Sequence, residues 1–114
     1  ERLSEKLTTQ SELEKLKEVF KKVDPDKQKL VEKLIHEAAF LADQNDHLRS
    51  LITQTGMIKT HPTQPNLQKP TEAGKQYLRN LQAYSVVIKT LGAVLTKNAI
   101  EEEDAFDSFL DEDE

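Results

Sequence analysis

Apolar residues recur at alternating spacings of three and four in two long stretches of this chain, which is typical of helices that pack along a seam. The first seam consists of Val31, Leu34, Ala38, Leu41, Asn45, Leu48 and Ile52. The second consists of Tyr77, Leu81, Tyr84, Ile88, Leu91 and Leu95. A long helix gains little stability from intrinsic propensity and must bury its apolar stripe. The sequence therefore predicts two long helices that pack against each other.

Local signals set the bounds of three helices. Ser11 and Glu14 fit a capping box, which predicts the start of a short first helix. Asp24 suits an N-cap and Pro25 suits the first helical position, so a second helix is expected there. Three prolines exclude a continuous helix in residues 56–70, which are expected to form a loop. The predicted helices span about residues 11–23, 25–54 and 71–97, with Thr71 as the N-cap of the third.

These elements predict an all-α fold: a short N-terminal helix plus a long antiparallel, coiled-coil-like helical hairpin. Helices joined by a single loop most simply fold back on each other. We expect one helical domain over residues 1–99 and a disordered acidic tail over residues 100–114. Only 36% of the residues are hydrophobic, so the core is thin and self-association is expected. Phe40 and Val86 point away from the seams and would suit such a subunit contact.

Charge is divided unevenly along the chain. Residues 101–114 hold nine of the 21 acidic residues and no Lys or Arg, so the rest of the chain is mildly basic. Two interpretations stay open: solvated helix faces with a solubilising tail, or contact with a nucleic acid. The candidate DNA-binding residues surround the corner between the first two helices and are Lys15, Lys21, Lys22, Lys27, Lys29 and Lys33. Lysines here would bind phosphates without reading base sequence.

The acidic tail also contains apolar residues. Phe106, Phe109 and Leu110 have the i, i+3, i+4 spacing that gives one apolar face on a helix. Mixtures of acidic and apolar residues are typical of segments that become ordered on a partner. The sequence predicts a docking segment. Its partner is either another protein or the chain's own lysine corner, and in the second case the tail would shield that corner from nucleic acid.

No arrangement of residues predicts an enzyme, a cofactor or a metal site. His36 and His47 lie about 16 Å apart on one helix face, too far to share a metal ion. The chain lacks cysteine, a Gly-rich phosphate loop and an apolar run of bilayer length, so no membrane contact is expected. Asn45 interrupts the first seam. It either fixes helix register by a paired hydrogen bond or marks a place where the seam opens to water.

Three segments together resemble small subunits of tailed-phage terminases. They are LVEKLIHEAAFLADQNDHLRSLITQTG, IKTHPTQPN and AGKQYLRNLQAYSVVIKTLGAVL, followed by an acidic ending with an F..FL element. The resemblance covers roughly residues 11–110. It implies a non-enzymatic DNA-packaging factor that forms oligomeric rings, binds viral double-stranded DNA and delivers it to the large terminase subunit.

On this resemblance, the helical hairpin would be the oligomerisation core, the lysine corner and first helix would face DNA, and the tail would dock on the large subunit. The expected location is the cytoplasm of an infected bacterial host. No helix-turn-helix motif is recognisable, so base-specific readout is not predicted. The alternative is a coiled-coil protein–protein adaptor without nucleic-acid binding.

Overall fold

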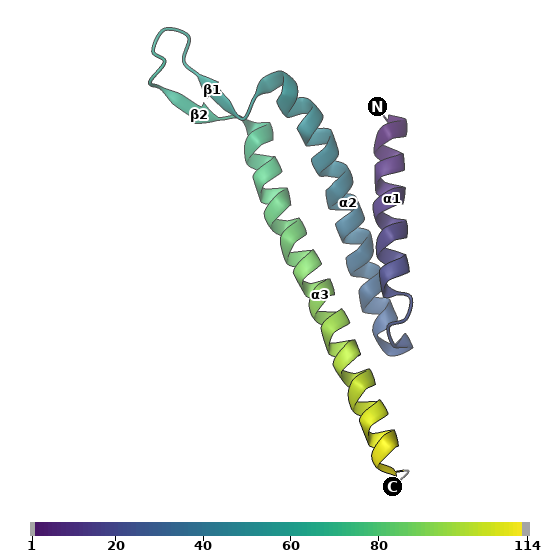
Figure 1. Ribbon diagram of the computed structural model, residues 1–114. Helices are drawn as coiled ribbons and strands as arrows, with labels where there is room; N and C mark the ends of the chain where they lie inside the picture. Colours follow the sequence, from purple (N-terminus) through teal and green to yellow (C-terminus); the bar gives the residue numbers. More distant parts are fainter. Residues whose placement is uncertain (1, 113–114) are drawn as a thin grey trace.

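The computed structural model describes the backbone of residues 2–112 and the side chains of residues 11–111. The elements in chain order are α1 (Arg2–Phe20), α2 (Pro25–Thr55), β1 (Ile58–Thr60), β2 (Gln68–Pro70) and α3 (Glu72–Glu112). Helices α2 and α3 run antiparallel side by side, and α1 packs against α2 (Figure 1). The molecule is a rod with extents of 81 × 33 × 16 Å. The predicted all-α helical hairpin with a short N-terminal helix is confirmed.

The core lies where the α1–α2 corner meets the second half of α3. Phe20 and Val23 come from the end of α1 and the turn after it, and Val31 and Ile35 come from α2. All four are buried with Leu91 of α3, which is 2% exposed. Partly buried apolar residues surround this cluster and include Leu13, Leu16, Leu34, Val87, Ile88, Val94 and Leu95. Each helix thus contributes its apolar stripe to one core, as the seams predict.

Hydrogen bonds from side chains close the turn between α1 and α2. Asp24 occupies the predicted N-cap position of α2, but its carboxylate makes no capping hydrogen bond. The Gln28 amide instead donates to the carbonyl oxygens of Phe20 (3.0 Å) and Val23 (2.7 Å). Across the corner, the backbone N–H of Asp24 donates to Oδ1 of the buried Asn98 on α3, at 3.3 Å. The turn is therefore tied to both long helices.

A two-stranded antiparallel hairpin replaces part of the loop expected over residues 56–70. The residues that pair across its two strands are Ile58 with Pro70, Lys59 with Lys69 and Thr60 with Gln68. The three prolines do exclude a helix, but Pro70 stands at the last position of the second strand, where a missing N–H is tolerated. The hairpin projects from the end of the rod where α2 passes into α3 (Figure 1).

The base of the hairpin is packed tightly against α3. Gly56 ends α2 with φ of +77°, a conformation that favours glycine. The Thr71 hydroxyl donates to the Gly56 carbonyl (2.8 Å) and accepts from the Gly74 N–H (3.0 Å), so Thr71 caps α3 as predicted. A Cβ at Gly74 would lie 2.9 Å from the Met57 carbonyl oxygen, so only glycine allows this approach.

Two helix boundaries differ from those predicted. Helix α1 begins at Arg2, so Ser11 and Glu14 lie within it and do not form a capping box. Helix α3 continues to Glu112, whereas the sequence predicts an end near Lys97 and a disordered tail. Neither residues 2–10 nor residues 98–112 contain proline or glycine, so no residue there interrupts a helix. Capping patterns and charge runs do not themselves end a helix.

Asn45 of α2 is only 3% exposed, so the seam does not open to water at this position. Its Oδ1 atom has no hydrogen-bond partner, and the same holds for Oδ1 of Asp43. The amide oxygen therefore makes no paired contact that would set the register of α2 within one chain.

Candidate functional site

The net positive charge of the chain lies in its middle section and not at the predicted lysine corner. Residues 47–100 contain seven Lys or Arg residues and a single acid, Glu72, which gives a net charge of +6. Residues 1–46 have a net charge of −2 and residues 101–114 of −9. The basic section covers the end of α2, the hairpin and most of α3, as far as Ile100. The acidic end of α3 lies at the opposite end of the rod (Figure 1).

The lysine corner is nearly neutral as a whole. Residues 12–33 hold seven lysines and six acidic residues. Lys21 pairs with Glu18 at 2.8 Å, and Lys27 pairs with Glu101 of α3 at 2.6 Å. The hydrogen bond to Glu101 raises the pKa of Lys27, and the same bond lowers the pKa of Glu101. Exposed lysines remain, so DNA contact at the corner stays a prediction, but the local attraction for a polyanion is small.

The remaining corner lysines are exposed: Lys15 on α1, Lys22 in the turn after it, and Lys29 and Lys33 on α2. Glu101 is the point where the acidic end reaches the corner. Past this residue α3 extends beyond the α1–α2 corner into solvent (Figure 1). Over residues 100–111, the tail pairs with the corner through Lys27 and does not lie across the corner.

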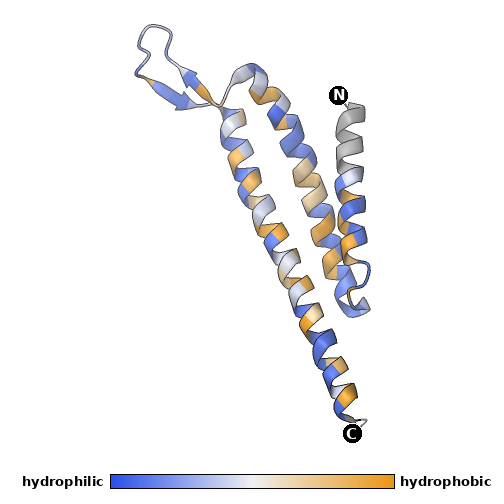
Figure 2. Cartoon of the chain, viewed as in Figure 1, coloured by the Kyte–Doolittle hydropathy of each residue, from blue (hydrophilic) through white to orange (hydrophobic). Residues whose placement is uncertain are grey.

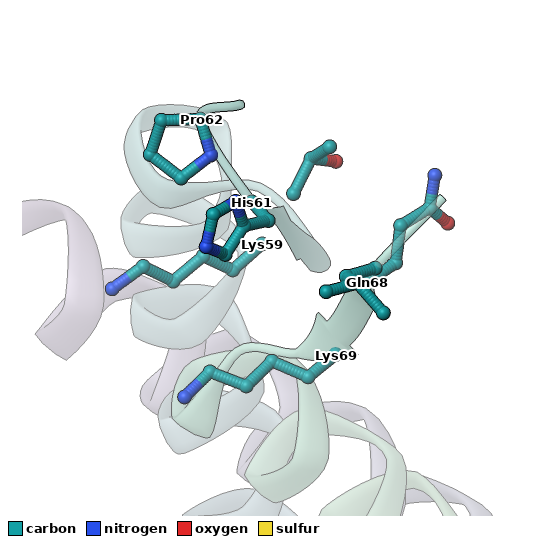
Figure 3. A pocket seen from close by; sticks show the side chains of 7 residues that line it. Lys59, His61, Pro62, Gln68 and Lys69 are labelled. Atoms are coloured by element: carbon teal, nitrogen blue, oxygen red, sulfur yellow. The ribbon is translucent and has the colours of Figure 1, made fainter. Parts of the chain in front are cut away.

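The hairpin presents two lysines directly opposite each other. Lys59 and Lys69 are a cross-strand pair, so their side chains lie on one face of the hairpin. Figure 3 shows both side chains extending in the same direction. Residues 56–71 contain no acidic residue, and both lysines are exposed. Like charges in this arrangement destabilise a hairpin, and a bound anion would relieve their repulsion.

His61 adds a third polar group to this face, because it follows Lys59 by two positions along the strand direction. Its Nδ1 atom accepts hydrogen bonds from the backbone N–H groups of Thr63 (3.2 Å) and Gln64 (3.1 Å). A ring nitrogen that accepts in this way carries no proton, so the neutral ring has its proton on Nε2. His61 thus offers one further donor beside the lysine pair.

These side chains line a hollow of about 340 Å³ on the hairpin (Figure 3). Its lining residues are Lys59, Thr60, His61, Pro62, Leu67, Gln68 and Lys69. The set combines two ammonium groups and one imidazole with no carboxylate. Such a group of donors suits a phosphate or another small anion, with Lys acting as a point charge.

The residues predicted for protein contacts are exposed, as those roles require. Phe40 on α2 is 56% exposed and Val86 on α3 is 60% exposed. Phe106, Phe109 and Leu110 are also exposed and belong to the final turns of α3. Figure 2 shows these turns as alternating hydrophobic and hydrophilic residues. A subunit contact through Phe40 and Val86 stays a prediction.

A second polar cluster ties the three helices together near the middle of the rod. Tyr84 of α3 donates a 2.5 Å hydrogen bond to Glu12 of α1. Burial, together with this hydrogen bond, raises the pKa of Tyr84 to about 12. Arg49 of α2 pairs with Asp46 of the same helix at 3.0 Å. Residues of α1, α2 and α3 line a hollow of about 250 Å³ beside this pair. The cluster is suited to fixing α1 on α3, because its charged groups already have partners.

The sequence reasoning missed both the lysine pair and this cluster. Lys59 and Lys69 are ten residues apart, and no strand signal links them across the prolines. The near absence of acidic residues between positions 47 and 100 is the feature of the sequence that indicates the basic section. Tyr84 and Glu12 are 72 positions apart, and no local pattern predicts that contact.

Among residues 11–111, no group of three or more His, Asp or Glu side chains is placed to hold a metal ion. None of the helices, over the part of the chain that the structure describes, has a span both long and apolar enough to cross a membrane. No protein-family model, curated protein or solved structure matches this chain.

Proposed function

We propose that this protein is a non-enzymatic DNA-packaging factor of the terminase small-subunit type. It self-associates, binds viral double-stranded DNA and hands that DNA to the large terminase subunit in the cytoplasm of an infected bacterium. The observation that carries the proposal is the charge separation along the rod, +6 over residues 47–100 against −9 over residues 101–114. A polyanion is attracted by the first section and repelled by the second, so the hairpin end receives the DNA.

The hairpin tip makes the phosphate contacts in this proposal. Lys59 and Lys69 each neutralise a phosphate and release its counterions, which supplies affinity. The Nε2–H group of His61 adds a hydrogen bond to a phosphate oxygen. Contacts of this kind position a duplex without reading its bases, in keeping with the lack of a recognition helix.

The first turns of α3 extend the cationic surface beyond the hairpin. Lys75 and Arg79 are exposed and lie four residues apart, on one side of the helix. Lys75 is partly neutralised by Glu72, whose carboxylate lies 3.4 Å from its ammonium group. Arg79 is therefore the stronger phosphate contact of the two.

Binding of duplex DNA, measured by fluorescence anisotropy at several salt concentrations, tests the proposal. The double variant Lys59→Ala/Lys69→Ala is expected to weaken binding and to lower the slope of log K against log salt by about two. The matched variant Lys21→Ala/Lys22→Ala removes the same charge from the corner and is expected to change the slope little.

The results separate the site from the function. If both double variants lose affinity equally, DNA responds to the overall charge of the protein, and the hairpin is not a specific site. If the unaltered chain shows no salt-dependent binding to duplex DNA, the DNA-packaging function itself is wrong.

The second candidate function is a coiled-coil adaptor without nucleic-acid binding. It is favoured by Phe106 and Phe109, which are 60% and 59% exposed at the end of a helix. An adaptor keeps its affinity for a protein partner when Lys21, Lys22, Lys27 and Lys29 are changed to Glu. A DNA-packaging factor keeps that affinity too, so salt-dependent binding of duplex DNA, which an adaptor does not show, separates the two functions.

A further inference from the structure

The end of α3 has no cover from its own chain. Every side chain from Ala99 to Asp111 is exposed, although Phe106 and Phe109 are large and apolar. The start of α2 lies beside Glu101, because Lys27 pairs with that residue. Beyond it α3 runs alone, with hydrophobic residues among hydrophilic ones (Figure 2). An exposed amphipathic helix end of this kind is suited to a partner.

A regular row of exposed residues runs along α3 beside the seam that faces α2. Its members are Leu78, Ser85, Gly92, Ala99 and Phe106, spaced by seven residues. All five are exposed, whereas the seam that faces α2 is buried or partly buried around Leu91. Side chains in the row are large at both ends and small in the middle. Two helices that cross at the middle approach closely there and diverge toward the large residues.

Gly92 is the centre of this row and also the midpoint of α3, which spans Glu72–Glu112. Glycine within a helix is destabilising relative to alanine. A Cβ at this position would meet nothing within 4 Å, so no contact within the chain calls for glycine here. Close approach of another helix does call for a small residue at the crossing point.

The charges on α3 select an antiparallel partner. Pairing of two α3 helices about Gly92 sets residues 101–112 of one copy along residues 72–83 of the other. The first segment holds seven acids and no cation, and the second holds Lys75, Arg79 and one acid. The hairpin lysines lie beyond the end of that second segment. Parallel pairing would instead place the seven acids of one copy beside those of the other.

We propose that α3 pairs with α3 of a second copy of this chain, antiparallel and centred on Gly92. Leu78 of each copy then packs against Phe106 of the other, and Ser85 packs against Ala99. The row of contacts from Leu78 to Phe106 spans about 42 Å of helix. This pairing deepens the proposed function by naming what covers the acidic end, and it does not rest on DNA binding.

Disulfide formation gives a direct test, because the chain contains no cysteine. Gly92→Cys is expected to cross-link with itself under mild oxidation. Neither Ser85→Cys nor Ala99→Cys is expected to cross-link alone, whereas an equal mixture of the two gives a mixed dimer. All three positions are exposed, so folding is at little risk, and circular dichroism checks it. Cross-linking of Ser85→Cys alone, to the same extent as the mixture, shows parallel pairing and overturns the proposal.

Light scattering on the unaltered chain provides the second readout, without DNA or other proteins. The expected mass is twice the 13.0 kDa of one chain, and it falls toward one chain at high salt. Phe106→Ala is expected to weaken the dimer by roughly tenfold or more. Phe40→Ala, which removes an equally exposed phenylalanine from α2, is the matched control and leaves the dimer intact.

A monomeric mass at every concentration, or an equal effect of the two phenylalanine variants, overturns the pairing. Either result concerns the mass of the chain in solution, whereas DNA binding is tested separately by the two lysine double variants. The failure of this proposal is therefore distinguishable from the failure of the proposed function.

Discussion

The hairpin end and the acidic end of α3 lie at opposite ends of the rod and are held in different ways (Figure 1). At the hairpin end, a strand ladder, the Thr71 cap and the close contact of Gly74 with Met57 fix the chain locally. At the acidic end, α3 continues alone past Glu101, with its side chains in solvent.

This difference suits each end to the partner proposed for it. The strands hold the backbones of Lys59 and Lys69 in register, so in the proposed phosphate contact only their side chains lose freedom. The acidic end carries exposed apolar side chains, which gain by burial against another protein. The fixed end suits an ion and the uncovered end suits an apolar surface.

The largest effect on stability is expected for the residue that α3 contributes to the buried core. Leu91→Ala removes a side chain that is 2% exposed and is expected to lower the free energy of unfolding by about 2–5 kcal/mol. Leu78→Ala on the same helix removes a side chain that is 57% exposed, and its expected cost is below about 1 kcal/mol. Urea unfolding followed by circular dichroism measures both. If both variants lose the same free energy of unfolding, then Leu78 is covered within a single chain, contrary to the structure.

Glycine-to-alanine changes at the two places are expected to have opposite signs. Gly74→Ala forces a Cβ to 2.9 Å from the Met57 carbonyl oxygen and is expected to destabilise the fold by about 1–3 kcal/mol. Gly92→Ala meets no neighbour and is expected to stabilise the monomer by up to about 1 kcal/mol. Urea unfolding at low protein concentration compares them. A stabilising Gly74→Ala would show that the hairpin base is looser than described.

Much of the helical architecture follows from the sequence. The two heptad seams predict α2, α3 and their antiparallel pairing, and Asp24 and Thr71 mark the starts of the two long helices correctly. The ends of α1 and α3 could not be predicted in the same way. A Ser–Glu capping pattern such as Ser11 and Glu14 is also compatible with a helix interior, and acidic residues tolerate helix well.

The candidate site was less accessible to sequence reasoning. Seven lysines clustered in sequence drew the interpretation to the α1–α2 corner, whereas interleaved acids and Glu101 neutralise much of that corner in space. The pairing of Lys59 with Lys69 depends on strand register, which no periodic signal in a proline-rich segment sets. Net charge over a window of about 50 residues would have found the basic section but not the pair.

A cap substitution tests the local fixing of the hairpin end. Thr71→Ala removes the acceptor of the Gly74 N–H and the donor to the Gly56 carbonyl, and is expected to cost about 1 kcal/mol. Thr71→Ser keeps the hydroxyl and should retain most of the stability. Ser11→Ala, within α1, is expected to change stability by less than about 0.5 kcal/mol. If Ser11→Ala costs as much stability as Thr71→Ala, then Ser11 caps a helix, which would contradict the structure.

The smallest effect is expected at the contact between the acidic end and the body. Lys27 lowers the pKa of Glu101, so the pair stabilises the fold above the pKa that Glu101 has in the unfolded chain. That stabilisation is lost as the pH falls through the lower, folded pKa. Glu101→Gln should therefore lower the urea midpoint slightly at pH 7, and the difference from the unaltered chain should vanish in acid or in high salt.

Glu103→Gln is the matched control for this contact, because it removes the same charge two residues along an exposed stretch of α3. If the ion pair matters, only the change at Glu101 lowers the midpoint at neutral pH. If both changes raise it equally, then repulsion among the acids of α3 outweighs the Lys27 contact. The acidic end would in that case be held in place by the helix alone, which would make its difference from the hairpin end greater still.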